Sequence, residues 1–291
     1  MDKKNRAQMN LILAMTIWGT VGIFVRNINL PSPETAFFRA LLAVIFLIFY
    51  MAIKKQKVAL RDIKAKLPVL ALSGTVLALN WIFLFQAYKY TTVSIATICY
   101  YFAPVLVMIL CPIIFREKLS ILQIVCFVMA TAGLFLTTGI GDMNHVNGKM
   151  IGIAYGILAA CFYAMVIILN KFINGIDSMD RTFLQLSVAV IVMLPYVIFT
   201  EGFHMNQLSI TGLMSLLIVG IVHTGIAYLL YFPAVKELTG QKTAILSYID
   251  PMIAVAASVF IIGESITMYQ LIGGMLILGF TCLNEIKGLK G

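Results

Sequence analysis

The chain contains one pattern twice: PVLVMILCPIIFREKLSILQ at Pro104–Gln123 and PMIAVAASVFIIGESITMYQ at Pro251–Gln270. In each copy a glutamate follows the proline by 13 residues, and a glutamine follows that glutamate by 6. Self-similarity at one fixed shift indicates an internal duplication. The same shift of 147 positions continues upstream, where it superimposes Ala87 on Ala234, Lys89 on Lys236 and Tyr101 on Tyr248.

Composition indicates that both copies lie in a membrane. Of 291 residues, 61% are apolar and 11% are charged, whereas a soluble domain is about half apolar and about a quarter charged. A helix needs about 20 apolar residues to cross the hydrocarbon core, and an open strand leaves its backbone unsatisfied in lipid. We therefore predict an all-α integral membrane protein. Ten transmembrane helices are expected near 8–25, 35–53, 67–88, 92–115, 120–138, 149–170, 181–200, 209–233, 243–262 and 268–285.

The duplication divides these ten helices into two sets of five. The first repeat is predicted at 1–145 and the second at 146–291, and the two together form one transmembrane domain. Because five is odd, the second set enters the membrane from the opposite side, which makes the repeats inverted. Inverted repeats give a chain two nearly equivalent packings, each open to one side of the membrane. The pattern therefore predicts a carrier that works by alternating access.

The distribution of positive charge predicts the orientation. With the N-terminus inside, seventeen Lys and Arg residues fall in cytoplasmic segments, and three (Arg26, Lys89 and Lys149) fall in outer loops. The positive-inside rule then places both termini in the cytoplasm of a multi-pass protein of the cell membrane. The net charge of +9 arises from basic loops that face anionic headgroups, so no nucleic-acid partner is expected.

Several motifs carry a family resemblance. They are the pair Trp18-Gly19, Arg39, the stretch from Pro104 to Glu117 that runs into Leu119-Ser120, and its second copy from Pro251 to Glu264 followed by Thr267 and Gln270. Over essentially the whole chain these motifs resemble the EamA family of the drug/metabolite transporter superfamily. The resemblance implies a ten-helix, basket-like fold and a carrier of metabolites, often an exporter of amino acids or related compounds. The second copy departs from the pattern where Tyr163-Ala164 stands in place of Trp18-Gly19.

Asp250 is the first candidate for solute contact. It lies about 12 Å into the ninth span at the helical rise, directly before Pro251, which disfavours helical geometry at Asp250. A charge at this depth is costly and indicates either function or pairing. Asp250 would bind a substrate amine or carry a coupling proton, and the alternative is an internal salt bridge or a protonated carboxyl.

Two further polar residues lie within spans. Arg39 would hold a substrate carboxylate in its planar fork, or else snorkel outward or pair with Glu34 or Asp250. His223 lies near the middle of the eighth span and would relay a proton with Asp250. The alternative for His223 is a hydrogen-bonded packing role.

Aromatic and amide side chains at similar depths suit a cavity for an amphipathic solute of amino-acid size. Aromatic packing inside a helix bundle would give the same pattern, so both interpretations stay open. The predicted solute-contacting residues of this kind are Trp18, Asn80, Trp81, Tyr100, Tyr101, Tyr228 and Tyr248.

Four residues are predicted at helix breaks or ends. Pro104 and Pro251 interrupt the fourth and ninth spans, and Glu117 and Glu264 occupy equivalent span ends on opposite faces, as gate or helix-end pairing residues. Gly152 and Gly156 form a small-xxx-small pair, which predicts close helix packing.

Nothing in the sequence indicates enzyme chemistry. It contains no HExxH motif and no Walker lysine loop, so we expect no catalytic residue, no metal and no cofactor. The expected partners are a small-molecule solute and the lipid bilayer, and the chain would act as a monomer or a homodimer. A secondary transporter of an amino acid or related solute, working by export, is the leading interpretation. The alternatives are a lipid or lipid-linked sugar flippase and a non-transporting membrane scaffold or sensor.

Overall fold

The computed structural model describes residues 3–55, 64, 66–90, 96, 99–100, 102–116, 118–137, 150–200, 202–257, 260–261 and 268–288. Every regular element in this part of the chain is a helix. The first half forms α1 (Lys3–Gly19), α2 (Val21–Val25), α3 (Ser32–Ile53), α5 (Leu67–Tyr90), α7 (Ala103–Phe115) and α8 (Ile121–Thr137). The second half forms α9 (Met150–Phe172), α10 (Ser178–Thr200), the 3₁₀ turn η2 (Met205–Gln207), α11 (Ile210–Gly220), the π-helix η3 (Ile221–Ile226), α12 (Ala227–Glu237), α13 (Gly240–Leu246), α14 (Ile249–Ala257) and α15 (Met268–Gly288).

The described helices are those of a multi-pass membrane protein. Among the described residues, two shorter apolar helices cover 103–115 and 121–136. Six helical stretches there are long and apolar enough to cross a bilayer: Lys3–Val25, Ser32–Ile53, Leu67–Ala87, Met150–Phe172, Ser178–Thr200 and Ile210–Glu237.

In the described part of the chain, four predicted spans are not continuous α-helices, and the one predicted at 92–115 contains a turn at Phe102, directly before α7. The span predicted at 8–25 is interrupted at Thr20, between α1 and α2. The span predicted at 209–233 contains the π-helix η3, and the span predicted at 243–262 is divided between α13 and α14. Pro251 is the third residue of α14, a position where its missing N–H costs no intrahelical hydrogen bond. Pro104 occupies the equivalent first-turn position of α7.

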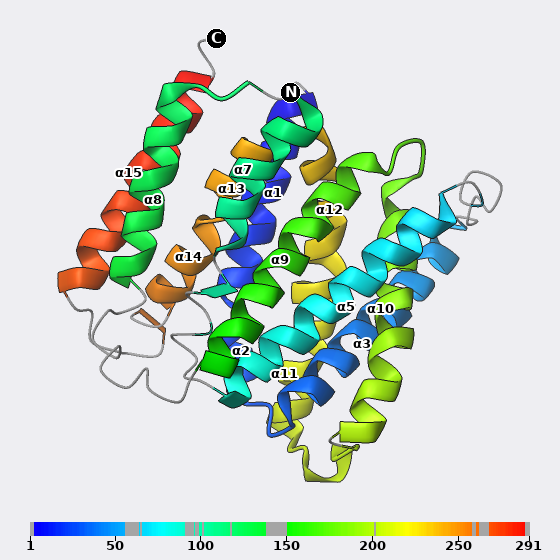
Figure 1. The fold of residues 1–291 in the computed structure, drawn as a ribbon. Helices are drawn as coiled ribbons and strands as arrows, with labels where there is room; N and C mark the ends of the chain where they lie inside the picture. Colours follow the sequence, from blue (N-terminus) through cyan, green and yellow to red (C-terminus); the bar gives the residue numbers. More distant parts are fainter. Residues whose placement is uncertain are drawn as a thin grey trace.

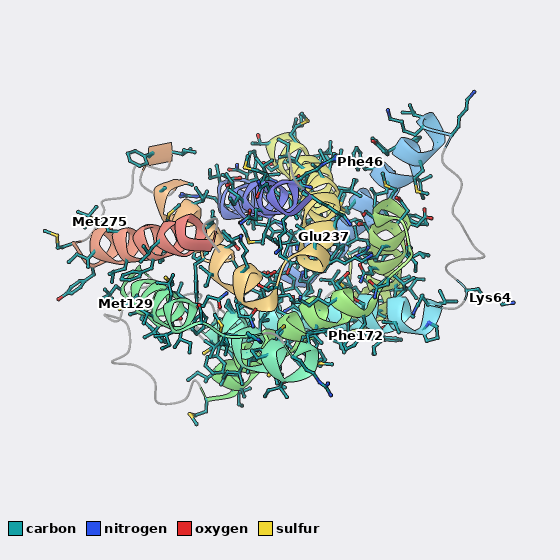
Figure 2. All side chains as sticks on the ribbon, turned by 90° about the horizontal axis from the view of Figure 1, so that it is seen from above. Phe46, Lys64, Met129, Phe172, Glu237 and Met275 are labelled. Atoms are coloured by element: carbon teal, nitrogen blue, oxygen red, sulfur yellow. The ribbon has the colours of Figure 1, made fainter. Side chains whose placement is uncertain are left out.

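The helices form one main bundle with a separate pair at its side. In that pair, α8 packs along α15 (Figure 1), and the pair contacts the main bundle at α13 and α14. The view from above places the pair, labelled at Met129 and Met275, at one edge (Figure 2). In the main bundle α1 packs against α12 and α14, α9 packs against α5 and α7, and α3 packs against α10 and α11. The start of α1 and the end of α15 lie at the same end of the molecule (Figure 1), which we call the terminal end.

Two helix crossings in the main bundle depend on glycine. A Cβ added to Gly74 of α5 would lie 2.6 Å from the carbonyl oxygen of Gln185 in α10. A Cβ added to Gly220 of α11 would lie 2.6 Å from the Cβ of Leu42 and 3.3 Å from the carbonyl oxygen of Arg39, both in α3. Helices in lipid associate through such close packing of small residues, because lipid tails are as apolar as the side chains. Gly156 of α9 serves the packing predicted for it, since its Cβ would lie 2.6 Å from the Cβ of Cys99.

A buried polar cluster joins α5, α9 and α10 toward the terminal end. Ser73, Asn170 and Gln185 are fully buried. The Gln185 Nε2 donates to the Ser73 Oγ at 2.5 Å and to the Asn170 Oδ1 at 3.2 Å, and the Asn170 Nδ2 donates to the Ser73 Oγ at 3.4 Å. Buried amides need such partners, because lipid and packed side chains offer none. We call these three residues the polar seal.

The opposite end of the bundle is held by a different contact. Glu34, in the first turn of α3, is fully buried. It accepts hydrogen bonds from the backbone N–H of His204 at 2.8 Å and from the His204 Nδ1 at 3.1 Å. This contact ties the start of α3 to the segment between α10 and α11.

Candidate functional site

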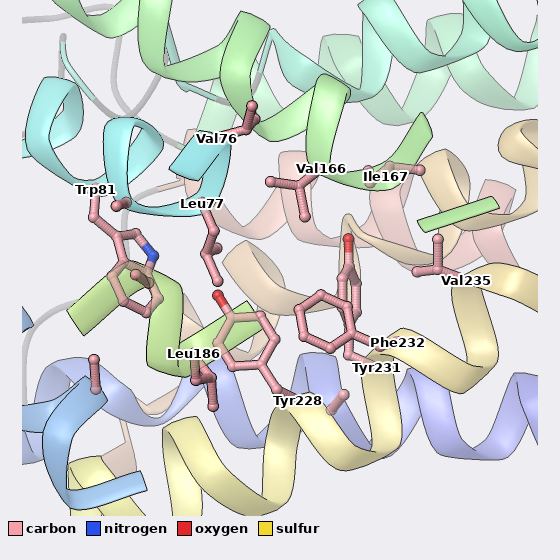
Figure 3. Packing of buried hydrophobic residues seen from close by; sticks show 14 of the residues in the cluster. Val76, Leu77, Trp81, Val166, Ile167, Leu186, Tyr228, Tyr231, Phe232 and Val235 are labelled. Atoms are coloured by element: carbon pink, nitrogen blue, oxygen red, sulfur yellow. The ribbon is translucent and has the colours of Figure 1, made fainter. Parts of the chain in front are cut away.

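An aromatic cluster occupies the middle of the main bundle. Trp18 of α1 lies with its ring centroid 5.0 Å from that of Tyr228 and 4.8 Å from that of Tyr231, both on α12. Trp81 of α5 approaches Tyr228 from the other side at 6.1 Å, and Phe232 stacks on Tyr228 at 4.8 Å (Figure 3). Three helices thus bring their aromatic faces together. We call these five residues the aromatic centre.

Arg39 lies against the aromatic centre. Its guanidinium carbon is 4.4 Å from the ring centroid of Trp81, and both side chains lie beside the Tyr228 hydroxyl. A guanidinium over an indole face is stabilised by the ring quadrupole, the more so away from water. The side chain keeps part of its surface exposed. The contact fixes the plane of the cation.

Asp250 and two tyrosines form the neighbouring wall. Tyr100 and Tyr163 stack at 5.4 Å with their planes 19° apart, and the Tyr231 hydroxyl donates to the Tyr163 hydroxyl at 3.3 Å. The charge of Asp250 acts on Tyr163. This wall therefore adds a carboxylate and two hydroxyls to the aromatic centre.

Gly19 explains how Asp250 comes so close to α1. A Cβ on Gly19 would lie 2.7 Å from the carbonyl oxygen of Asp250 and 2.6 Å from the Cβ of Ile253. The first turn of α14 therefore packs directly on the end of α1. The pair Trp18-Gly19 thus combines an indole in the aromatic centre with an empty space for the backbone of α14.

The π-helix η3 places His223 at the edge of the aromatic centre. The N–H of Ala227 donates to the carbonyls of Val222 and Thr224, rather than to that of His223 as in an α-helix. The His223 carbonyl instead accepts the indole N–H of Trp18 at 2.7 Å. Short π-helical segments occur often at functional sites, and this one links α1 to the eighth span.

The structure brings together most of the predicted solute-contacting residues, but two lie elsewhere. Asn80 is buried and donates to the backbone carbonyl of Ala159 at 2.7 Å, so it holds α5 to α9. Tyr248 is buried against α8, where its hydroxyl lies 2.7 Å from the Thr131 Oγ1. Tyr101, Glu117 and Glu264 lie outside the described residues.

Sequence reasoning did not select three residues that belong to the site. Tyr231 follows Tyr228 by three residues, and this helical spacing would have placed both on one face. Tyr163 stands at the repeat position of Trp18, and both residues contact Tyr231. Thr20 lies with its Oγ1 3.1 Å from the His223 Nε2. The sequence carries no signal for this contact, because His223 belongs to a distant helix.

The chemistry available at the site is that of binding. The aromatic centre offers apolar faces, Arg39 a planar cation, and Asp250 a carboxylate. Among the described residues no three His, Cys, Asp or Glu side chains gather as metal ligands. An apolar cavity of about 240 Å³ lies away from this site, along α7 and α8, and its lining is Phe102, Val105, Phe127, Val128, Thr131, Leu134 and Phe135.

Known proteins resemble this chain over nearly its full length. It is 33% identical over 290 residues to an uncharacterized transporter, YxxF, of Bacillus subtilis (strain 168), and the match covers 98% of this chain and 91% of that protein. A probable amino-acid metabolite efflux pump of Salmonella typhimurium (strain LT2) is 26% identical over 94% of this chain and 92% of its own length. One crystal structure has the same fold, with a TM-score of 0.83 at 16% identity over 94% of this chain and 95% of that one.

The family model agrees with the duplication found in the sequence. The EamA-like transporter family matches residues 5–139 and, separately, residues 150–284. These matches confirm the resemblance drawn from the Trp18-Gly19 and proline–glutamate motifs. With helices that are long and apolar enough to cross a membrane, the chain belongs to the EamA-like transporter family and is a multi-pass membrane transporter.

Proposed function

We propose that the protein is a secondary transporter that exports an amino acid or a related amphipathic metabolite by alternating access. The observation that carries the proposal is the relation between the two glycine crossings. When the two halves are aligned with a shift of 146 positions, Gly74 corresponds to Gly220 and Arg39 corresponds to Gln185. Gly74 of the first half packs on Gln185 of the second, and Gly220 of the second packs on Arg39 of the first.

Such an exchange of partners is expected when two repeats are related by a two-fold axis in the membrane plane. Other contacts show the same exchange. In the first half, α1 packs on α12 and α14 of the second half, and in the second half, α9 packs on α5 and α7 of the first. On this proposal, residues 1–145 and 146–291 are inverted five-helix repeats of one ten-helix domain. The positive-inside rule adds that both termini are cytoplasmic, so the polar seal closes the inner side.

The proposed substrate has a carboxylate, an amine and an apolar body. Arg39 would donate to the carboxylate, because its planar fork matches two carboxylate oxygens. Asp250 would pair with the amine. The aromatic centre would contact the apolar part, as in most small-molecule sites, where a few polar groups fix orientation. The efflux pump among the relatives supports both the amino-acid class and the outward direction.

Transport by purified protein in proteoliposomes tests this function. Asp250→Asn and Arg39→Gln should each reduce the flux of radiolabelled amino acids by tenfold or more, because a hydrogen bond to a charged group contributes about 1.5–3 kcal/mol. Arg26→Gln is the matched control, since Arg26 is exposed at the end of α2. Normal flux through Asp250→Asn from pH 5 to 8 would exclude the role given to Asp250, and the absence of all flux would favour a scaffold or sensor.

A lipid or lipid-linked sugar flippase is the competing transport function. It requires a lateral opening lined by polar groups for the headgroup. The cavity along α7 and α8 is apolar except for Thr131, which favours the metabolite carrier. A scrambling assay with fluorescent lipids in the same proteoliposomes separates the two, and lipid movement without amino-acid flux would replace our proposal with the flippase.

A further inference from the structure

The His223 ring faces a backbone carbonyl on one side and a hydroxyl on the other. The side chain is buried, with 4% of its surface exposed. The Nδ1 lies 3.4 Å from the carbonyl oxygen of Ile218, and the Nε2 lies 3.1 Å from the Oγ1 of Thr20. The same Thr20 hydroxyl donates to the carbonyl oxygen of Ile17 at 2.7 Å.

These contacts determine how many hydrogens the two nitrogens of the His223 ring carry. The Ile218 carbonyl only accepts, so the His223 Nδ1 carries a hydrogen. Thr20 has one hydroxyl hydrogen, and while it points at Ile17, the Thr20 oxygen offers only lone pairs to the Nε2. Both ring nitrogens then donate, and this is the hydrogen content of the imidazolium. A neutral ring satisfies the same contacts only if the Thr20 hydroxyl turns away from Ile17 and donates to the Nε2.

We propose that His223 is a proton-binding site whose protonation state is transmitted to the break between α1 and α2 by the hydroxyl of Thr20. When a proton adds to the Nε2, the new N–H donates to the Thr20 oxygen, and the hydroxyl hydrogen rotates to the Ile17 carbonyl. No covalent bond other than the N–H forms or breaks. Thr20 lies between α1 and α2, so the exchange acts where the first span is interrupted.

A second contact places the same device beside the solute site. The His223 carbonyl accepts from the indole of Trp18, which is two residues before Thr20 and belongs to the aromatic centre. One turn of the first span thus holds both the side chain and the backbone of His223. The link between the proton and solute movement rests on the proposed function, whereas the proton site itself rests on these contacts alone.

Two of the helices packed against η3 carry charged or titratable groups of the site. From α3, the positive charge of Arg39 acts on the ring, so a carboxylate bound at Arg39 would favour proton uptake. The helix α12 carries Tyr228 and Tyr231 of the aromatic centre. The helices α1, α2 and α11 carry no titratable side chain against η3, since the charges of α1 (Lys3, Lys4 and Arg6) all lie in its first turn at the terminal end. The ring of Phe24 in α2 covers the imidazole at 5.1 Å.

Nuclear magnetic resonance of the imidazole nitrogens tests the site without any solute. The full-length protein, labelled with ¹⁵N in its three histidines and held in lipid nanodiscs, is titrated from pH 8 to pH 5. Subtracting the spectrum of His223→Gln assigns His223. We expect one protonated nitrogen, Nδ1, at pH 8 and two at pH 5. A ring that stays neutral throughout would overturn the proposal.

A pair of threonine variants tests the part played by Thr20. Thr20→Val keeps the side-chain shape and removes the acceptor for the Nε2, so His223 should bind its proton about tenfold or more weakly, because hydrogen bonds to charged groups are strong. Thr16→Val is the matched control, because Thr16 makes the same kind of backbone bond, to Ile12 at 2.9 Å, one turn earlier. Identical titrations of Thr20→Val and wild type would contradict the transmission through Thr20. Neither result depends on whether amino acids are transported.

Discussion

At the scale of single residues, the site depends both on the missing Cβ of Gly19 and on the backbone and ring atoms that its side chains contact. The Trp18 indole needs a carbonyl that η3 leaves available, and Asp250 needs the space that Gly19 leaves at the end of α1. Arg39 needs the face of Trp81 to hold its plane. Each of these requirements joins residues far apart in the sequence.

Gly19→Ala should destabilise the protein by about 1–3 kcal/mol, the usual cost of overpacking. The added Cβ would lie 2.6 Å from the Cβ of Ile253 and 2.7 Å from a carbonyl oxygen, and backbone atoms yield little. Gly22→Ala is the control, because a Cβ there meets nothing within 4 Å. Thermal unfolding in detergent measures both, and equal melting temperatures would show that α14 moves freely away from α1.

At the scale of elements, the helices are held by small crossings and by buried amides. The polar seal joins α5, α9 and α10 through three hydrogen bonds that have no alternative partner in lipid. By contrast, the ion pair between Lys3 and Glu237, at 3.2 Å, lies largely in solvent, with the Lys3 side chain 78% exposed. Exposed pairs contribute little, so the seal is the stronger link between helices at the terminal end.

A double-mutant cycle of Asn170→Ala and Gln185→Ala should give a coupling free energy of about 0.6–1.7 kcal/mol, the range for hydrogen bonds between transmembrane helices. Unfolding in mixed micelles provides the measurement. The control cycle pairs Gln185→Ala with Asn80→Ala, because Asn80 donates to the backbone carbonyl of Ala159 rather than to a residue of the seal. Additive effects in both cycles would show that the seal contributes no specific energy.

At the scale of the whole molecule, the exchange of helix partners between the halves is what the proposed inverted repeats predict. The terminal end carries the polar seal and Lys171, which donates to the Leu238 carbonyl at 2.8 Å. The opposite end carries the contact between Glu34 and His204. The two ends are thus closed by different chemistry, as expected where only one of them faces the cytoplasm.

Single cysteines introduced into a cysteine-free background should report the orientation. Lys54→Cys, at the end of α3, should react with an impermeant thiol reagent only from the cytoplasmic side, because the positive-inside rule places that loop there. Gln207→Cys, in η2, should react only from outside. Both positions are exposed. The reverse pattern of labelling would invert the orientation, and labelling of both from one side would contradict the inverted topology.

Most of the fold could be predicted from the sequence, because its signals are local. A run of about 20 apolar residues predicts a span wherever it occurs, and each described α-helix overlaps a predicted range, although some, among them α1, α3 and α13, begin before it and others, among them α12, end beyond it. The helix breaks and the π-helix within the spans were harder to predict from the sequence. The division between α13 and α14 has a sequence signal close after it, Pro251 in the first turn of α14, whereas the π-helix around His223 has no proline and depends on tertiary contacts.

The site was predictable only in part, because in a membrane both faces of a helix are apolar. Phe199 is 86% exposed and Ile210 is 83% exposed, while Tyr231 is fully buried, and hydropathy does not separate these positions. Asn80 and Tyr248 are of residue types that occur at solute sites, but in the structure Asn80 bonds to Ala159 of α9 and Tyr248 packs against α8. The sequence by itself determined the spans, the duplication and the family. Only the tertiary structure decided which side chains meet, because contacts between distant helices depend on close packing at Gly19, Gly74 and Gly220, where space rather than polarity selects the partner.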